Sequence, residues 1–234
     1  QEITVNKLVY AVVRELDGRD IPVMGVNIGG LGFLTSVSEN EIARSLDCLA
    51  RDCFDVSIRA IAEAVVWRGP RAMARYRALN DVVIVNGPSS RILTLNVSIG
   101  GDKGTAYVCD GLIVSTPTGS TGHSLSAGGP IVTPETPAFV ISLICPHTLS
   151  SRPVVVPDRG EIAIRLIDSA GQARLSVDGQ VGRMLGEGET EAPAGLLARC
   201  RRDLAVQVSG AAGSRRRRIT LSELWRNWVV NPPM

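Results

Sequence analysis

The sequence predicts two domains, an α/β domain and an all-β domain of the β-sandwich type. Three observations predict this division. The first third of the chain combines helical and strand patterns, the apolar residues from about residue 54 recur at every second position, and the tail again has a helical pattern. A chain of 234 residues is long enough for two modest domains. We therefore expect residues 1–53 together with 219–234 to form the α/β domain, and residues 54–218 to form the all-β domain.

The elements of the α/β domain follow one another along the opening third. Leu8–Leu16 has the spacing of a short helix, and Ile21–Asn27 is a strand rich in β-branched residues that ends in a glycine turn. Ser38 and Glu41 have the spacing of a capping box, which predicts a helix directly after them. The apolar face of that helix is expected to contain Ile42, Leu46 and Leu49. Leu221–Val230 predicts a terminal helix that returns to this domain.

The all-β domain is predicted from short strands separated by turns. Apolar and polar residues alternate, as is typical of half-buried strands, in residues 54–64, Leu93–Ile99 and Arg174–Asp178. Short apolar runs that suit buried strands are Val82–Val85, Leu112–Val114, Phe139–Ile144 and Val154–Val156. At Thr190–Ala198 no strand register is evident.

Composition and charge give no support for several classes of protein, among them nucleic-acid-binding, membrane-binding and disulfide-rich proteins. The formal net charge of +2 gives no argument for binding nucleic acid or a membrane surface, so we expect neither partner. The opening residues have no pattern of a cleaved targeting signal, and we expect a cytoplasmic protein. The 5 cysteines are odd in number and have no metal-ligand spacing, which favours buried thiols over disulfides or a zinc site.

The segment Asp110–Pro130 has the composition of a ligand-binding turn. An apolar strand is followed by four glycines, which allow close approach of the backbone to a ligand, and by short hydroxyl side chains that donate and accept hydrogen bonds. A loop of this composition also occurs for solvation alone. The number of hydroxyl groups here exceeds what a structural turn requires, and we interpret the segment as part of a binding site.

Several motifs, in this order, resemble those of the NAD kinase family. They are Pro22–Asn27 with Leu31–Leu34, Leu79–Ile84, Asp110–Pro130, Ile144–Ser150 followed by Arg152–Pro157, and Val177–Gln180. The resemblance implies ATP-dependent phosphorylation of the adenosine ribose 2′-hydroxyl of NAD, which gives NADP. It also implies a Rossmann-like, phosphofructokinase-like α/β domain, of which the chain has an incomplete version, before the β-sandwich.

The resemblance implies which residues bind NAD. Asn80 and Asp81 match positions that hydrogen-bond the ribose, although the family commonly has Glu in place of Asp81. The residues that match the turn around the adenine and its ribose are Thr121, Gly122, His123 and Ser126. The family usually has Ala at Gly122 and Tyr at His123. Because an imidazole becomes charged near neutral pH, we hypothesise that protonation of His123 weakens NAD binding.

Three further NAD-binding positions follow from the resemblance, each with a structural alternative. Asp110 and Asp178 match acceptors of ligand hydrogen bonds, but an Asp-Gly pair also commonly closes a turn. Phe33 matches a ring that faces the dinucleotide, although an aromatic residue beside Leu34 also suits a core. His147 is interpreted as structural, bonded within its own turn.

The catalytic residue cannot be assigned within these residues. The family has a Gly-Gly-Asp-Gly-Thr loop ahead of the first motif, whose aspartate acts as general base, and the 234 residues do not contain this loop there. The similar run Gly100–Thr105 contains an additional lysine and follows an alternating strand, so we interpret it as a β-hairpin turn and do not assign Asp102 to catalysis. We expect that the loop belongs to a segment not included here, which predicts an abrupt junction near Lys7 and Leu8.

The resemblance also implies ligands and partners. We expect NAD in the cleft between the two domains, ATP with a divalent ion, Mg²⁺, on the α/β side, and a homodimer or homotetramer formed through the β domain. No metal ligand is assignable from the sequence. The alternatives are a catalytically silent dinucleotide-binding relative, a lipid or sphingoid-base kinase of the same superfamily, which requires a wide apolar pocket, and a β-sandwich interaction module without a ligand.

Overall fold

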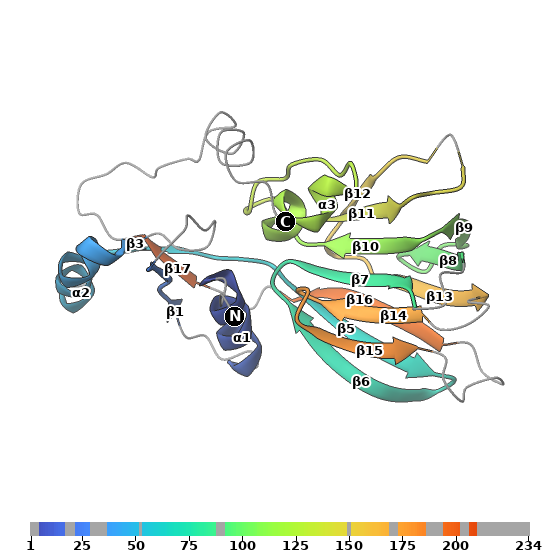
Figure 1. The fold of residues 1–234 in the computed structure, drawn as a ribbon, viewed down its shortest axis with the longest axis horizontal. Coiled ribbons are helices and arrows are strands. Elements are labelled where there is room, and N and C mark those ends of the chain that lie inside the picture. The colour runs from blue at the N-terminus through green and yellow to red at the C-terminus, as the bar shows by residue number, and fades with distance from the viewer. Residues whose placement is uncertain are drawn as a thin grey trace.

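Two six-stranded sheets form the larger part of the protein in a computed structural model (Figure 1). The structure describes residues 5–16, 22–28, 37–51, 53–87, 92–148, 151–168, 173–185, 194–201 and 206–209. Phe33, the motif at Leu31–Leu34 and the predicted terminal helix Leu221–Val230 lie outside these residues. No helix in the described part of the chain is long and apolar enough to cross a membrane.

The first six-stranded sheet contains the motif-bearing strands. Its order is β12 (Val154–Pro157), β11 (Ala138–Ile144), β10 (Gly111–Ser115), β7 (Asp81–Asn86), β14 (Ala173–Val177) and β15 (Val181–Leu185). All its neighbouring strands are antiparallel. All four apolar runs predicted as strands lie in this sheet, which confirms them.

The second six-stranded sheet packs against the first. Its order is β6 (Arg71–Ala78), β5 (Ile61–Arg68), β16 (Ala194–Arg201), β13 (Ile162–Asp168), β8 (Leu93–Ile99) and β9 (Thr105–Cys109). One hydrophobic cluster contains buried residues of both sheets, among them Leu95 of β8 and Phe139 of β11. The predicted β-sandwich is therefore confirmed, with its core between the two sheets.

The alternation of apolar and polar residues predicted burial well in strands that have one face in the core and the other partly exposed to solvent. In β8 the residues Leu93, Leu95 and Val97 are buried and those between them are half-buried, as expected. In β5 the alternation is wrong, because residues 61–66 are all buried. One face of β5 lies in the sandwich core, while Ile61 packs with Val13 of the N-terminal helix. β16 was not evident from the sequence, and it lies between β5 and β13.

The N-terminal segments form the smaller part of the molecule, on the left of Figure 1. Helix α1 (Val5–Glu15) starts before the predicted helix and continues through Lys7 and Leu8, so the predicted junction is not seen. The single strand expected at Ile21–Asn27 is instead two short ones, β1 (Pro22–Val23) and β2 (Val26–Asn27). β2 pairs in parallel with β3 (Val37–Ser38).

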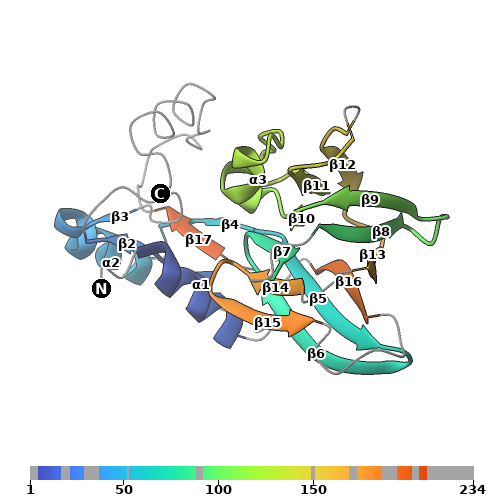
Figure 2. The same ribbon diagram turned by 45° about the vertical axis from the view of Figure 1, so that its right-hand side comes forward.

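A three-stranded sheet links this part to later segments of the chain. β17 (Val206–Ser209) lies between β1, with which it is parallel, and β4 (Asp55–Ser57), with which it is antiparallel. Figure 2 shows β17 and β4 of this small sheet beside α1. The predicted domain limits at residues 53 and 218 stay a prediction, and the small sheet takes strands from both sides of the first limit.

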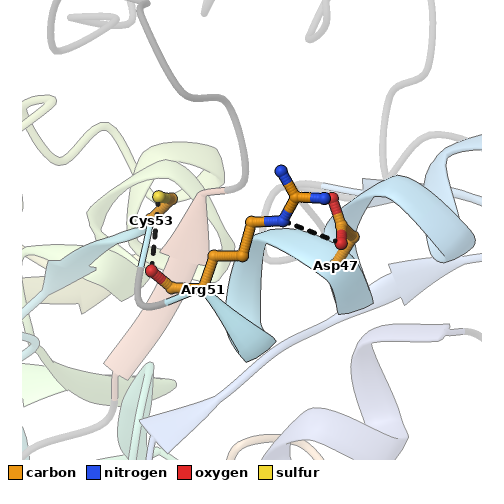
Figure 3. A network of polar contacts seen from close by, with 3 residues as sticks. All are labelled: Asp47, Arg51 and Cys53. Carbon is orange, nitrogen blue, oxygen red and sulfur yellow. Dashed lines mark hydrogen bonds and ion pairs between the residues drawn. The ribbon is translucent and has the colours of Figure 1, made fainter.

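The helix predicted after Ser38 is present. The capping box of Ser38 and Glu41 precedes a 3-10 turn (Glu39–Glu41) and helix α2 (Ile42–Ala50). Leu46 was expected on the buried face but is 54% exposed, and Ser45 and Cys48 are buried instead. At its C-terminal end, Arg51 Nε donates to Asp47 Oδ1 at 3.0 Å and the Cys53 thiol donates to the Arg51 carbonyl at 3.4 Å (Figure 3).

Candidate functional site

Three motifs that are far apart in the sequence meet at one end of the first sheet. β7 lies between β10 and β14 and is antiparallel to both, with Ser115 opposite Asp81 and Val177 opposite Val82. The start of β7 therefore adjoins the ends of its two neighbours. This register brings together the Leu79–Ile84, Asp110–Pro130 and Val177–Gln180 motifs.

Asp178 holds the backbone at the entrance to β7. Its Oδ1 accepts hydrogen bonds from the N–H groups of Asn80 at 2.8 Å and Asp81 at 3.2 Å, and its Oδ2 accepts one from Leu79 at 3.1 Å. Asp178 has a φ of +50°, a conformation that aspartate tolerates better than most residues. Both carboxylate oxygens are thus engaged by the protein, and the ligand contact predicted for Asp178 stays a prediction.

The hydroxyl-rich turn holds the same backbone from the other side. The Thr116 N–H donates to the Asn80 carbonyl at 2.8 Å, and the Thr116 hydroxyl donates to the Leu79 carbonyl at 2.6 Å while accepting from the Gly119 N–H at 3.1 Å. Gly119 follows in the 3-10 turn η2 (Thr118–Thr121). A Cβ on Gly119 would lie 2.1 Å from the Asn80 carbonyl oxygen, so the two backbones touch directly.

The side chain of Asn80 has one free hydrogen-bonding atom. Its Nδ2 donates to the Tyr10 hydroxyl of α1 at 2.8 Å. Its Oδ1 is buried and has no hydrogen-bond partner among the described residues. A buried amide oxygen without a donor costs free energy. Asn80 Oδ1 could therefore accept a hydrogen bond from a hydroxyl or N–H group of a bound ligand.

Two buried carboxyl groups and a half-buried phenol share this site. Burial, and then the charge of Asp178, raises the pKa of Asp81 to about 7. Burial also raises the pKa of Asp178, although backbone N–H groups and Arg14 oppose the shift. Burial, followed by Asp178, raises the pKa of Tyr10 to about 12. Asp81 therefore exchanges its proton near neutral pH, whereas Tyr10 keeps its own.

The raised pKa of Asp81 makes stability depend on pH. A carboxyl group with a higher pKa in the folded protein favours folding in its protonated form. Its contribution is fully present below the unfolded pKa of about 3.9 and is lost as the pH rises through about 7. We expect the free energy of unfolding, measured with urea, to fall between about pH 4 and pH 7 and to level off above that, and Asp81→Asn to reduce the fall. Asp102→Asn, at an exposed turn, is the control, and equal slopes for Asp81→Asn and wild type would contradict the assignment.

The remaining residues of the hydroxyl-rich turn lead to a short helix that lies beside β10 and β11. The Thr121 hydroxyl donates to the Thr118 carbonyl at 3.4 Å, and Gly122 leads into the one-turn helix α3 (His123–Ser126). His123 and Ser126 are exposed. Partial burial lowers the pKa of His123. A Cβ on Gly122 would lie 3.8 Å from Asn80 Nδ2, which places this part of the turn next to Asn80.

Asp110 lies at the other end of β10. Because the strand has five residues, this position is roughly 17 Å from the entrance to β7. His147 was expected to bond within its own turn, but its Nε2 lies 3.9 Å from Asp110 Oδ1 and its backbone N–H donates to the Val108 carbonyl at 2.9 Å. The structure thus brings Asn80, Asp81, Thr121, Gly122 and Asp178 together and leaves Asp110 apart.

Asp102 lies in the hairpin turn between β8 and β9, as predicted. The two strands are antiparallel, and Gly100 and Gly101 in the turn have φ values of +64° and +88°. The Asp102 N–H donates to the Ile99 carbonyl at 3.1 Å. The Gly100–Thr105 run is therefore a structural turn at the far edge of the second sheet.

Sequence reasoning did not identify Tyr10 and Arg14 as parts of this region. Both lie on α1, four residues apart and therefore on one face. Tyr10 bonds Asn80, and Arg14 Nη2 donates to Gln180 Oε1 at 2.8 Å. The signal available was a polar pair at helical spacing beside the apolar residues Val9 and Val13. Which motifs the pair contacts depends on how α1 docks.

No protein-held metal site is formed by the described residues. Among them, no three His, Cys, Asp or Glu side chains come close enough to hold an ion. The two buried carboxyl groups of the site are Asp81 and Asp178, and backbone N–H groups occupy the oxygens of Asp178. We therefore assign none of the residues that the structure describes to a metal ion.

Comparisons with known proteins agree with the motifs. A family model described as ATP-NAD kinase N-terminal domain matches residues 9–54, and one described as ATP-NAD kinase C-terminal domain matches residues 79–190. An NAD kinase of Syntrophotalea carbinolica is 44% identical over 76% of this chain and 63% of its own length. An NAD kinase of Geobacter metallireducens is 47% identical over 75% of this chain and 62% of its own. The chain thus spans about three fifths of the length of these curated relatives.

Solved structures show the same fold. The crystal structure of a yeast NADH kinase complexed with NADH aligns with a TM-score of 0.74 and 28% sequence identity, and covers 83% of this chain and 56% of that one. An NAD kinase from Archaeoglobus fulgidus in complex with ATP aligns with a TM-score of 0.72 over 86% of this chain and 74% of its own. Its sequence identity of 23% supports likeness of fold only.

Proposed function

The chain belongs to the ATP-NAD kinase family, and we propose that it transfers the terminal phosphate of ATP to the adenosine ribose 2′-hydroxyl of NAD, giving NADP. The observation that carries the proposal is the environment of Asn80. Asp178 and Thr116 hold its backbone, and its buried Oδ1 has no donor among the described residues. Phosphoryl transfer requires accurate positioning of an acceptor hydroxyl more than covalent help from the protein. A rigid amide with one open acceptor is suited to that task.

We propose the following contacts for NAD. Asn80 Oδ1 accepts a hydrogen bond from a ribose hydroxyl, and the carboxyl group of Asp81 faces the same sugar. The adenine and its ribose contact the turn formed by Thr121, Gly122, His123 and Ser126. Phe33, Asp110 and Asp178 keep the ligand contacts that the resemblance implies. The polar character of this turn favours a nucleotide over the apolar substrate of a lipid kinase.

ATP is the proposed phosphate donor, and it approaches from the α/β side with a divalent ion, Mg²⁺. When bound to the phosphates, the ion would neutralise part of their charge. No general base is assigned to a residue of this chain. The residues of this chain contribute to the reaction by orienting the ribose whose hydroxyl accepts the phosphate.

The assay that tests the proposal follows NADP formation by the purified full-length protein, with the segment that carries the glycine-rich loop, in the presence of NAD, ATP and Mg²⁺. NADP formation that depends on both nucleotides supports the kinase. Tight NAD binding without turnover would instead identify a catalytically silent dinucleotide-binding relative. Phosphorylation of a sphingoid base in place of NAD would identify the lipid-kinase alternative. A protein that binds neither nucleotide would contradict the proposal and favour an interaction module.

His123 provides a test of the adenine side of the site. Because partial burial lowers its pKa, the imidazole is neutral at pH 8 and becomes charged at a pH below its ordinary value of about 6.5. We expect NAD affinity to weaken as the pH falls towards about 5.5, by roughly threefold to tenfold. Isothermal titration calorimetry at a series of pH values measures this change.

The matched control is His123→Tyr, which introduces the residue usual in the family. Tyrosine does not titrate in this range. Any pH dependence of NAD affinity that remains in the variant is therefore attributed to Asp81, whose pKa is about 7. An affinity that is flat with pH in the wild type, or a dependence that the variant retains in full, would overturn the role of His123.

We further propose that the protein is a cytoplasmic homodimer or homotetramer that binds neither nucleic acid nor membranes. The described cysteines Cys48, Cys53, Cys109 and Cys145 are free, which suits a reducing compartment. Sedimentation equilibrium of the purified protein tests the oligomer. We also propose that residues 1–53 with 219–234 and residues 54–218 act as two domains with NAD between them.

A further inference from the structure

We propose that Tyr10 is a positioning residue for this nucleotide site, whose hydroxyl orients the side-chain amide of Asn80 towards the substrate's ribose hydroxyl. The inference rests on the proposed function. It assigns a role to α1, which none of the family motifs includes. In this role Tyr10 acts through Asn80 and has no contact with the substrate itself.

The contact between Tyr10 and Asn80 engages one atom of the amide and leaves the other for the ligand. Asn80 Nδ2 donates to the Tyr10 hydroxyl at 2.8 Å, so the amide nitrogen is engaged by the protein. Oδ1 is then the atom without a partner among the described residues. A turned amide would present a donor in place of the acceptor at the ligand position, and the phenol could then donate to Oδ1. In the arrangement seen here Nδ2 donates to Tyr10, and the contact fixes the plane of the amide so that Oδ1 is directed at the open position.

The backbone of Asn80 is already fixed, and its side chain is what remains free to turn. Asp178 accepts from the Asn80 N–H, and Thr116 donates to the Asn80 carbonyl. Gly119 packs on the same peptide group. With both backbone groups held, only the side-chain torsions of Asn80 can change the direction of Oδ1. The bond to Tyr10 restricts those torsions, which is how a supporting residue pre-organises a binding group.

Tyr10 is itself held by the docking of α1 on the β-sandwich. Val13 is buried with Ile61 and Leu79, and Val9 and Tyr10 pack against them. One turn further along α1, Arg14 Nη2 donates to Gln180 Oε1 at 2.8 Å. The helix is thus anchored by apolar contacts and by a second polar contact on the same face. Because Leu79 directly precedes Asn80, the packing of α1 and the placement of the amide are mechanically linked.

The protonation state of Tyr10 suits an acceptor role. Burial and the charge of Asp178 raise the pKa of Tyr10 to about 12. The phenol is therefore neutral throughout the physiological range, and an oxygen lone pair accepts from Asn80. The contact does not titrate with Asp81, so its effect on binding is expected to be constant from pH 6 to pH 9.

The test compares Tyr10→Phe with wild type by calorimetric titration of NAD. Phenylalanine keeps the ring that packs near Val13 and removes only the hydroxyl. Loss of one positioning hydrogen bond is expected to weaken NAD binding about fivefold, with the same ratio at each pH. Tyr107→Phe is the matched control, because Tyr107 is a half-buried tyrosine on β9 in the other sheet, and it should leave NAD affinity unchanged.

A double-variant cycle separates positioning from other roles. In an Asn80→Ala background the hydroxyl has nothing to orient, so adding Tyr10→Phe should cause no further loss of affinity. A further fivefold loss in that background would overturn the inference, since Tyr10 would then act independently of Asn80. Hydrogen exchange of the Asn80 side-chain amide in the wild-type protein is the second measurement. Protection supports the bond, and exchange at the rate of a free amide overturns it even if Tyr10→Phe does not fold.

The outcomes also distinguish this inference from the proposed function. If wild type binds NAD and Tyr10→Phe binds it equally well, only the inference fails. If Tyr10→Phe and Tyr107→Phe weaken binding equally, the inference fails as well, because the effect is not specific to the hydroxyl at Asn80. If wild type does not bind NAD, the proposed function fails and this inference fails with it.

Discussion

Replacing Gly119 by alanine is expected to destabilise the protein by about 3 kcal/mol and to lower NAD phosphorylation by roughly a hundredfold. The added Cβ would lie 2.1 Å from the Asn80 carbonyl oxygen and 2.5 Å from its carbon. Both are backbone atoms of a segment held by Asp178 and Thr116, so neither can move aside cheaply. The strain would displace the residue that presents Oδ1 to the ligand. Urea unfolding measures the first effect and NADP formation the second.

Gly122→Ala is the matched control for this prediction. Its Cβ would lie 3.4 Å from the Gly119 carbonyl oxygen and 3.8 Å from Asn80 Nδ2, which are ordinary contact distances. The free energy of unfolding should change by less than about 1 kcal/mol. If the two alanine variants were equally stable, the close packing of Gly119 on Asn80 would be contradicted.

Removal of the Asp178 carboxylate is expected to have an effect of similar size. Asp178→Ala leaves three N–H groups, those of Leu79, Asn80 and Asp81, without their acceptor. Alanine also fits the φ of +50° less well than aspartate does. We expect a loss of about 3–5 kcal/mol in the free energy of unfolding at pH 8 and loss of measurable NAD binding.

Two further variants test whether the lost backbone contacts cause the loss of stability in Asp178→Ala. Asp178→Asn keeps one acceptor oxygen and tolerates the same backbone conformation, so it should lose about half as much stability. Asp102→Ala removes an exposed carboxylate from the β8–β9 turn and should change the free energy by less than about 0.5 kcal/mol, with NADP formation retained. Equal effects of Asp178→Ala and Asp102→Ala would show that the three backbone contacts do not stabilise the site.

The sequence predicted those elements whose pattern is local. β8 and β14 alternate because one side of each faces the sandwich core, and the apolar runs of β7, β10 and β11 are central, buried strands. The alternation in β5 failed because both of its faces are buried, one in the sandwich core and the other, at Ile61, against α1. β16 was missed because Leu196 and Leu197 are adjacent and do not alternate. In both cases the environment of the strand is set by segments distant in the sequence.

The candidate site shows the same division. The hydroxyl-rich turn, the Asn80–Asp81 pair and Asp178 were identified from short motifs. How these motifs contact one another was not predicted, since the sequence left open whether Asp178 binds a ligand or closes a turn. The structure shows its carboxylate bound to the backbone of the Leu79–Asp81 segment. Tyr10 has no motif at all and is recognised only by the 2.8 Å contact with Asn80.

By itself, the sequence determined which chemical groups are present, several of the strands that form the sandwich and the kinase family to which the motifs point. These properties depend on neighbouring residues, whose spacing along the chain is fixed by covalent bonds. Only the tertiary structure decided that the entrance to β7 lies between the ends of β10 and β14, that Asp110 lies at the opposite end of its strand, and that α1 docks on Asn80. Strand register and helix docking depend on packing energies summed over segments that are far apart in the sequence, as between Arg14 and Gln180, which lie 166 positions apart.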